Sequence, residues 1–273
     1  MVAAQRRASG VAGSPGADWS DRLARFGLVG KSILHAVLGL LALELALNGA
    51  SSEEASAAGA AAWISDRPFG TPALWVVAAS LLALAVWRAG TAVNGDPVEE
   101  DDGVHRAAWG VQAVVYLGFA LTFAAAARSG GSDSGSSGES RTQSSTSTVF
   151  DWPMGRWLVV AAGLAVIGFA IYLIVRHAVN GSFAERLRCP EDPVVVTLGR
   201  VGYGLRSVAY VLVGGLIASA GLSGEEERAE GLSGALQRTA EAGWGRAVLV
   251  AVAGGFLTYG AYCVAEARLR RAA

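Results

Sequence analysis

The sequence predicts an all-α polytopic membrane protein whose six transmembrane helices form three tandem two-helix repeats in a pseudo-threefold arrangement. Composition, six long apolar stretches and an internal repeat support this fold class. Of the 273 residues, 52% are hydrophobic and 16% are charged, whereas about 25% are charged in a typical soluble domain. Much of the surface is therefore expected to face lipid.

The six apolar stretches each have about the 20 residues that an α-helix needs to cross a hydrocarbon core of about 30 Å. Backbone polar groups in lipid must be satisfied within the segment, so stretches of this length and continuity are predicted to be helices. They cover approximately residues 26–47, 73–93, 107–127, 157–179, 201–220 and 247–265.

A repeated polar pattern marks the first helix of each repeat. In repeats 1 and 3 the pattern recurs at a constant offset of 175 residues, which relates Arg25, Gly27, Lys31, Ser32, His35 and Gly39 to Arg200, Gly202, Arg206, Ser207, Tyr210 and Gly214. The middle copy, at an offset of 81, has Arg106, Ala108, Gln112, Tyr116 and Ala120. We predict a disordered cytoplasmic N-terminus over 1–22, repeat 1 over 23–96, repeat 2 over 97–183 and repeat 3 over 184–273.

The second helices share similar starts and ends. They follow Pro68-Phe69-Gly70, Pro153-Met154-Gly155 and Gly243-Trp244-Gly245. A large apolar residue between Pro or Gly residues suits the membrane interface. The first two end in Asn94-Gly95 and Asn180-Gly181, where a left-handed residue is expected to close the helix.

Two external loops have distinctive compositions. Residues 129–148 are mostly Ser, Thr and Gly, which predicts a disordered tether. The run Glu225-Glu226-Glu227 could attract a cation, but a solvated helix start is the simpler interpretation.

The distribution of arginine predicts the orientation, because Lys and Arg near helix ends stay on the cytoplasmic side. The N-terminal segment, the second and fourth connections and the C-terminus hold more Arg than the other three loops. We therefore expect a multi-pass protein of the cytoplasmic membrane with both termini in the cytoplasm. Residues 1–20 lack the apolar core of a signal peptide, and Cys189 and Cys263 give no spacing typical of a disulfide or zinc site.

The candidate site consists of six polar residues at equivalent positions of the three first helices, one pair per helix: Lys31 and His35, Gln112 and Tyr116, Arg206 and Tyr210. The second member of each pair lies one turn further along the same face. Ionisable residues within membrane helices normally face the bundle interior. If the first helices line the axis, the six groups form a polar ring suited to an anion, such as a phospholipid headgroup, a carboxylate or a phosphate.

Structural interpretations of these residues compete with the ligand site. Lys31 and Arg206 lie about six residues, or about 9 Å, inside the apolar stretches, a depth from which both can snorkel to the headgroups or pack in the bundle. His35 could bond a neighbouring helix. Glu44, near the outer end, suggests either a proton relay or interfacial exposure.

Enzymatic and cofactor-dependent alternatives have weaker support. Haem needs two strong ligands at facing depth, but His105 and His177 are predicted at the inner edge and His35 deeper, so no cofactor is expected. Hydrolase and nucleotide-binding motifs are missing from the sequence.

Our leading hypothesis is a non-enzymatic membrane protein that binds or conducts a small anionic or lipidic ligand. The competing class is a structural or assembly subunit that contacts another membrane protein. The expected partners are membrane lipid, a small anion or another membrane protein. Nucleic acid is not among them, because the Arg abundance reflects a bias for Arg over Lys and is by itself no evidence for nucleic-acid binding.

The Arg-x-Gly pattern, the following basic residue with Ser, the His or Tyr one turn later and the Pro-Phe-Gly type helix starts together resemble a bacterial membrane family, the domain of unknown function 1206 family. The resemblance covers residues 23–268 and implies three tandem two-helix units with six membrane spans. Gln112, Ala108 and the Ser-rich loop depart from the pattern. The family implies no reaction, substrate or catalytic residue.

Overall fold

The computed structural model describes residues 15–49, 51–95, 103–129, 154–187, 189, 192–223 and 232–270. Within these ranges the protein is helical, and the β-type pairing is limited to one isolated bridge between Leu187 and Arg270. The six predicted apolar helices are confirmed. They are α1 (Pro15–Asn48), α3 (Gly70–Asn94), α4 (Gly103–Ser129), α6 (Gly155–Leu173), α7 (Pro193–Ser223) and α9 (Gly245–Leu269). The fourth span continues from α6 through the π-helical segment η2 (Ile174–Val179).

The helix α1 begins earlier than the sequence predicted. Residues 15–22, which we expected in a disordered terminus, are helical. Pro15 stands at the first helical position, where proline is favoured because its missing N–H is not needed. Asp21 and Arg25 add an ion pair of 2.9 Å one turn apart. Residues 1–14 lie outside the described ranges.

Two short helices occur between the first and second long helices of repeats 1 and 3, and the sequence did not predict them. They are α2 (Ala57–Ser65) and α8 (Leu232–Glu241). Each packs closely on the start of the following long helix. A Cβ on Gly70, at the start of α3, would lie 2.5 Å from the Ile64 carbonyl oxygen of α2. A Cβ on Gly245 would lie 1.5 Å from the carbonyl oxygen of Thr239. The glycines at these helix starts are therefore required by close approach.

The apolar residues before the second helices have the geometry expected of interface anchors. Phe69 and Met154 have left-handed backbones, with φ of 65° and 73°, and both side chains are exposed, as is that of Trp244. The left-handed closure of the second helices is confirmed at Gly181, with φ of 66° and ψ of 24°, whereas Gly95 combines a φ of 83° with an extended ψ of 167°. The Ser-rich segment 130–148 and the run 225–227 fall outside the described residues.

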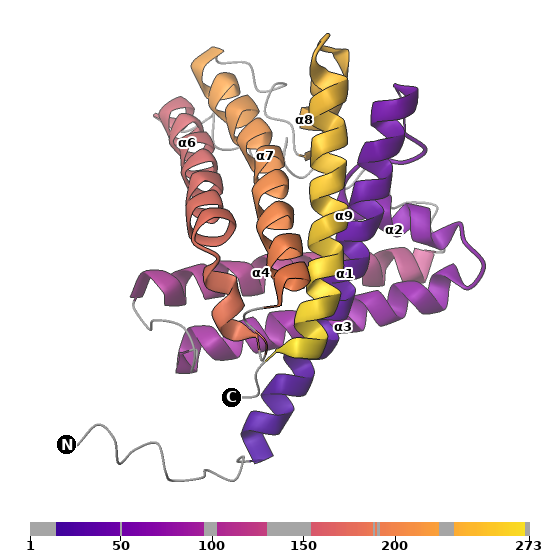
Figure 1. Cartoon of the computed structure of the whole chain (residues 1–273). Coiled ribbons are helices and arrows are strands. Elements are labelled where there is room, and N and C mark those ends of the chain that lie inside the picture. The colour runs from indigo at the N-terminus through magenta and orange to yellow at the C-terminus, as the bar shows by residue number, and fades with distance from the viewer. Residues whose placement is uncertain are drawn as a thin grey trace, which may run out of the picture.

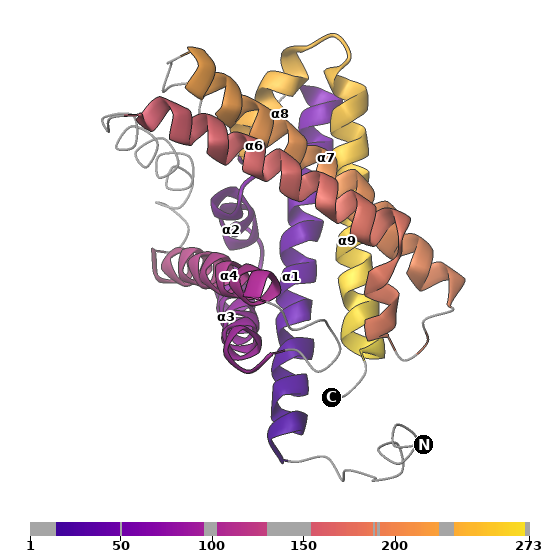
Figure 2. The same ribbon diagram turned by 90° about the vertical axis from the view of Figure 1, so that its left-hand side faces the viewer.

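The long helices form three pairs, and each pair joins two different repeats. The second helix of one repeat packs against the first helix of the next, so that α3 pairs with α4, α6 with α7, and α9 with α1 (Figures 1 and 2). The last pair closes the ring. The pairs are inclined to one another, with α3 and α4 crossing α1 and α9 in Figure 1. This cyclic order is the predicted pseudo-threefold arrangement.

Equivalent glycines allow the close approach within two of these pairs. A Cβ on Gly39 of α1 would lie 2.8 Å from Leu257 Cγ in α9. A Cβ on Gly214 of α7 would lie 2.8 Å from Ile167 Cγ1 in α6. In a bilayer the hydrophobic effect does not drive helices together, so they associate through close packing, which small residues allow. The repeated sequence pattern thus produces a repeated contact.

The first and second helices of one repeat pack on each other in repeats 1 and 3 but not in repeat 2. The helix α1 contacts α3, and α7 contacts α9, whereas α4 and α6 share almost no contact over the residues described. The middle repeat is therefore open.

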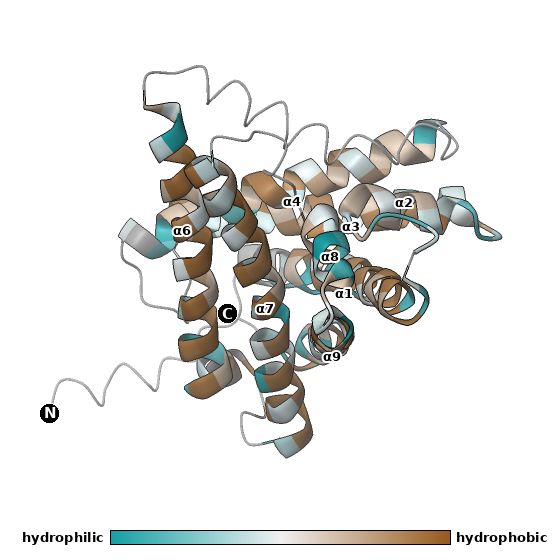
Figure 3. Ribbon diagram, turned by 90° about the horizontal axis from the view of Figure 1, so that it is seen from above, coloured by the Kyte–Doolittle hydropathy of each residue, from teal (hydrophilic) through white to brown (hydrophobic). Residues whose placement is uncertain are grey.

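The exterior of the long helices is apolar, as expected of a surface in lipid. Figure 3 shows α6 as mainly hydrophobic, whereas the short α8 is largely hydrophilic. The spans contain 25 to 31 residues, or about 37 Å and more at about 1.5 Å per residue. This length exceeds the thickness of the hydrocarbon core, about 30 Å. The protein is a multi-pass membrane protein.

Candidate functional site

A cavity of about 400 Å³ lies between α4 and α6, and α1 and α7 contribute its deeper wall. This volume falls in the usual range for small-ligand sites, which combine apolar walls with a few convergent polar groups. The charged and aromatic residues that line it are Lys31, Arg88, His105, Trp109, Tyr116, Phe169, Tyr172, Arg176, His177, Tyr203, Arg206 and Tyr210. Gln112, Ala108, Val111, Val115, Val166 and Leu173 complete the lining.

The structure brings together the polar positions of all three first helices. Five of the six predicted site residues line this one cavity: Lys31, Gln112, Tyr116, Arg206 and Tyr210. The sixth, His35, stands beside it and contacts Arg206. The proximity of these side chains is thus observed, and their binding of a ligand stays a prediction.

Lys31 and Arg206 lie further from the start of their helices than the apolar stretches suggested. They lie ten residues after Asp21 and thirteen after Pro193, where their spans begin, or about 15 Å and 20 Å along the helices. Both side chains are buried. This burial favours packing in the bundle over snorkelling, because a snorkelling side chain extends its charge to the headgroups.

Tyr259 of α9 is the central support of the two cations. Its ring centroid is 3.9 Å from Arg206 Cζ and 5.0 Å from Lys31 Nζ. The two cationic centres therefore lie within about 9 Å of each other. Each contact with the ring face stabilises a desolvated cation by up to about 2 kcal/mol. Sequence reasoning missed Tyr259 because Leu84 and Phe169 occupy the equivalent positions, so that no repeated polar signal marks it.

His35 has a positioning geometry. Its Nδ1 lies 2.8 Å from the Lys31 carbonyl oxygen, and because a carbonyl only accepts, Nδ1 must be the donor. In the neutral ring, Nε2 then has a lone pair, which accepts from Arg206 Nη1 at 3.5 Å. Ser32, one residue after Lys31, donates to the Gly260 carbonyl at 2.8 Å and ties α1 to α9. His35 therefore orients a cation from behind the cavity.

The π-helical segment η2 adds a cation and an imidazole to the cavity. Arg176 and His177 both come from this segment, and π-helical turns occur frequently at functional sites. Ser182, in the 3₁₀ segment η3 (Ser182–Arg186), donates to the Arg176 carbonyl at 2.9 Å. Its Oγ is thus free to accept from His177 Nδ1 at 3.0 Å. The sequence analysis did not place Arg176 among the candidate site residues.

Carboxylates are absent from the residues that line the cavity. Neither Lys31 nor Arg206 has an ion pair with the described part of the chain. Glu44, the other intramembrane charge we singled out, accepts from Ser52 at 2.9 Å near the far end of α1 and does not line the cavity.

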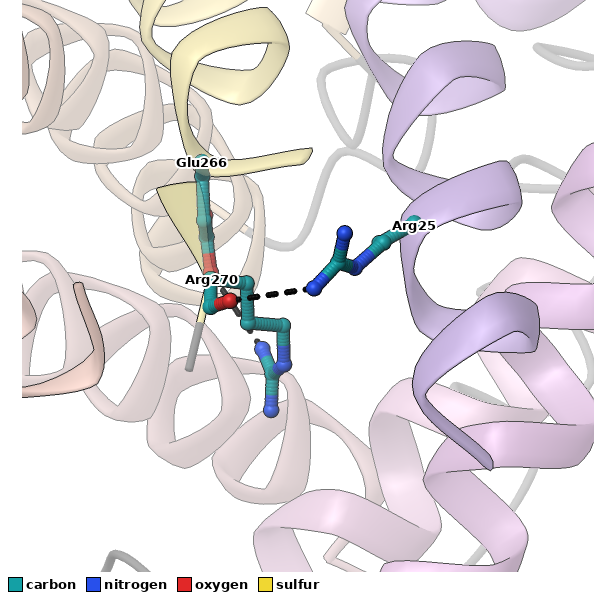
Figure 4. A network of polar contacts seen from close by, with 3 residues as sticks. All are labelled: Arg25, Glu266 and Arg270. Carbon is teal, nitrogen blue, oxygen red and sulfur yellow. Dashed lines mark hydrogen bonds and ion pairs between the residues drawn. The ribbon is translucent and has the colours of Figure 1, made fainter. Parts of the chain in front are cut away.

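The buried carboxylate of Glu266 belongs to a separate network at the end of α9 (Figure 4). It pairs with Arg270 Nη1 at 3.4 Å. Arg25 of α1 donates to the Arg270 carbonyl oxygen at 3.3 Å. Arg270 also lies over the ring of Trp87 in α3, at 4.3 Å. This network joins α1, α3 and α9 and includes neither Lys31 nor Arg206.

The two central cations repel each other. At about 9 Å and an effective dielectric constant of about 20, the repulsion is about 2 kcal/mol, and it grows at shorter separation. An anion between them would replace this repulsion with attraction. The guanidinium of Arg206 offers the donor fork that binds a phosphate or carboxylate in two places, and the Lys31 ammonium offers a point charge.

Six apolar spans, arranged as three tandem repeats around a cationic cavity, define the class of protein as a polytopic helical membrane protein. A comparison with protein-family models identifies the family. The chain belongs to the family described as "Domain of Unknown Function (DUF1206)", which matches residues 26–95, 107–178 and 201–270. Each matched segment covers most of the first and second long helices of one repeat, which confirms the three tandem repeats and the family resemblance.

A curated relative has similar length. The chain is 24% identical over 259 residues to "Uncharacterized protein YxxB" of Bacillus subtilis (strain 168), and the alignment covers 90% of each chain. Solved structures gave no match.

Proposed function

We propose that this protein resides in the cytoplasmic membrane and binds an anionic group in the cavity between α4 and α6. The observation that carries the proposal is the pair of buried cations, Lys31 and Arg206. They share the ring of Tyr259 and have no ion pair with the described residues. Burial of a cation in a membrane helix is costly unless it is paired.

The chemistry of the donors favours a phosphate or a carboxylate. Arg206 supplies a planar fork and Lys31 a point charge. Gln112 and the hydroxyl groups of Tyr116 and Tyr210 add hydrogen-bond donors on the same cavity wall. The role we propose for these groups is binding or conduction of the anion.

The orientation of the chain is part of the proposal. Arg25 contacts Arg270, and Arg270 lies over Trp87, next to Arg88. Arg88 and Arg176 both line the cavity between α4 and α6. These basic residues therefore gather at one end of the bundle, which the positive-inside rule assigns to the cytoplasm together with both termini.

Native mass spectrometry of the protein released gently from its own membrane tests the proposal. We expect an anionic ligand mass on the wild type, loss of at least nine-tenths of it in Arg206→Gln, and substantial retention in Arg206→Lys, which keeps the charge. Arg246→Gln is the matched control, because Arg246 is exposed at the start of α9. A thermal melt of each variant confirms that it is folded.

Two results would overturn the proposal. One is a bound mass that is equal in wild type and a folded Arg206→Gln variant. The other is a bare protein, or a protein partner without any anion, which would favour the structural or assembly subunit.

A further inference from the structure

The middle repeat departs from its neighbours at the contact between its two long helices. In repeat 1, a Cβ on Gly27 would lie 2.6 Å from Leu84 Cβ, and in repeat 3, a Cβ on Gly202 would lie 2.8 Å from Tyr259 Cα. The counterparts in repeat 2 are Ala108 and Phe169 by the same offsets. These two residues line the cavity instead.

The burial of equivalent side chains shows the same departure. Leu84 and Tyr259 are 1% exposed, but Phe169 is 45% exposed. On the first helices, Leu34 and Ala209 are fully buried, whereas Val115 is 45% exposed. The exposed residues of repeat 2 are as apolar as their buried counterparts.

Between α4 and α6 the cavity opens among exposed apolar side chains, a surface that suits contact with lipid. Val111, Val115 and Phe169 form the apolar part of this opening, and Lys31 and Arg206 lie behind it. Figure 2 shows α4 and α6 as members of two different helix pairs. Arg88 and Arg176, nearer the helix ends, extend the basic lining toward the interface. The opening thus joins an apolar entrance to a cationic interior.

A molecule with an apolar chain and an anionic group matches both parts of this cavity. A lipid can bring its headgroup in from the side while its chains stay in the bilayer, whereas a soluble anion satisfies only the cations. Resting on the proposed function, we infer that the ligand is an anionic phospholipid that enters between α4 and α6. Its phosphate binds Lys31 and Arg206, and its chains lie along Val115 and Phe169.

A lipid titration followed by native mass spectrometry tests this inference. The probes are dioleoyl phosphatidylglycerol, dioleoyl phosphatidylcholine and glycerol 3-phosphate, added to delipidated protein. We expect phosphatidylglycerol to bind at least tenfold more tightly than either of the other two. Val115→Trp should weaken its binding at least fivefold by filling the opening. Val114→Trp is the matched control, because Val114 is 71% exposed on the same helix and lies outside the cavity.

The possible failures separate the inference from the proposed function. If glycerol 3-phosphate binds as tightly as phosphatidylglycerol and the two Trp variants behave alike, the ligand is a soluble anion. The inference is then overturned and the anion site stands. If both lipids bind equally and Arg206→Gln changes neither, or if no probe binds, the anion site falls as well.

Discussion

Gly202→Ala tests the helix contact that supports the cationic site. The added Cβ would lie 2.8 Å from both Cα and N of Tyr259. These are backbone atoms of α9, so no side-chain rotation relieves the clash, and α7 and α9 must move apart. Such overpacking costs about 1–3 kcal/mol. Alanine is better than glycine inside a helix by about 1 kcal/mol, which offsets part of the loss.

Gly215→Ala is the control that isolates the contact, because Gly215 lies on the same helix with nothing within 4 Å of the added Cβ. It should gain the helix propensity without the clash. The two variants then differ by the overpacking cost of roughly 2 kcal/mol, or about 4–8 °C in melting temperature at roughly 2–4 °C per kcal/mol. Tryptophan-monitored melts in detergent micelles measure this difference. Equal melting temperatures would refute the proposed packing of α7 on α9.

Three further outcomes are expected. Tyr259→Leu should lower the free energy of unfolding by about 2 kcal/mol, since both cations lose a ring face. Tyr259→Phe should keep most of that stability. Equal melting temperatures of the two variants would argue against the ring contacts. Glu266→Gln should destabilise the protein by about 1–3 kcal/mol by removing the charged hydrogen bond between Glu266 and Arg270. Because the pair is buried, thermal melts at two salt concentrations should show nearly the same loss of stability. A membrane-impermeant maleimide should label the exposed Cys189 in inside-out vesicles and not in right-side-out vesicles, and the reverse would invert the proposed orientation.

The sequence alone predicted the number of apolar spans and the polar positions that line the cavity. Length and hydropathy mark a membrane helix because the bilayer imposes both. The offset of 175 residues singles out Lys31 and Arg206 because the same face of each first helix turns to one interior. The comparison between repeats therefore predicted which side chains lie close together in space.

The comparison of first helices could not reveal what the second helices contribute to the site. Tyr259 contributes from a second helix at a position where the other repeats carry Leu84 and Phe169. The short helices α2 and α8 depend on contacts with neighbouring long helices, which hydropathy does not encode.

The opening of repeat 2 was only hinted at in the sequence. Ala108 replaces the glycine that allows close packing in repeats 1 and 3, and we noted this departure without a structural consequence. Whether a lost glycine separates two helices depends on what else they can pack against. Here, α4 packs on α3 and α6 packs on α7, so each helix of the middle repeat is held by a neighbouring repeat.

The most direct test of the central claim is an experimental density map of the protein in nanodiscs that contain phosphatidylglycerol. We expect α4 and α6 to stand apart, with headgroup density between the side chains of Lys31 and Arg206. A map in which Phe169 packs against Ala108 as Tyr259 packs against Gly202, with no density beside the two cations, would contradict the account.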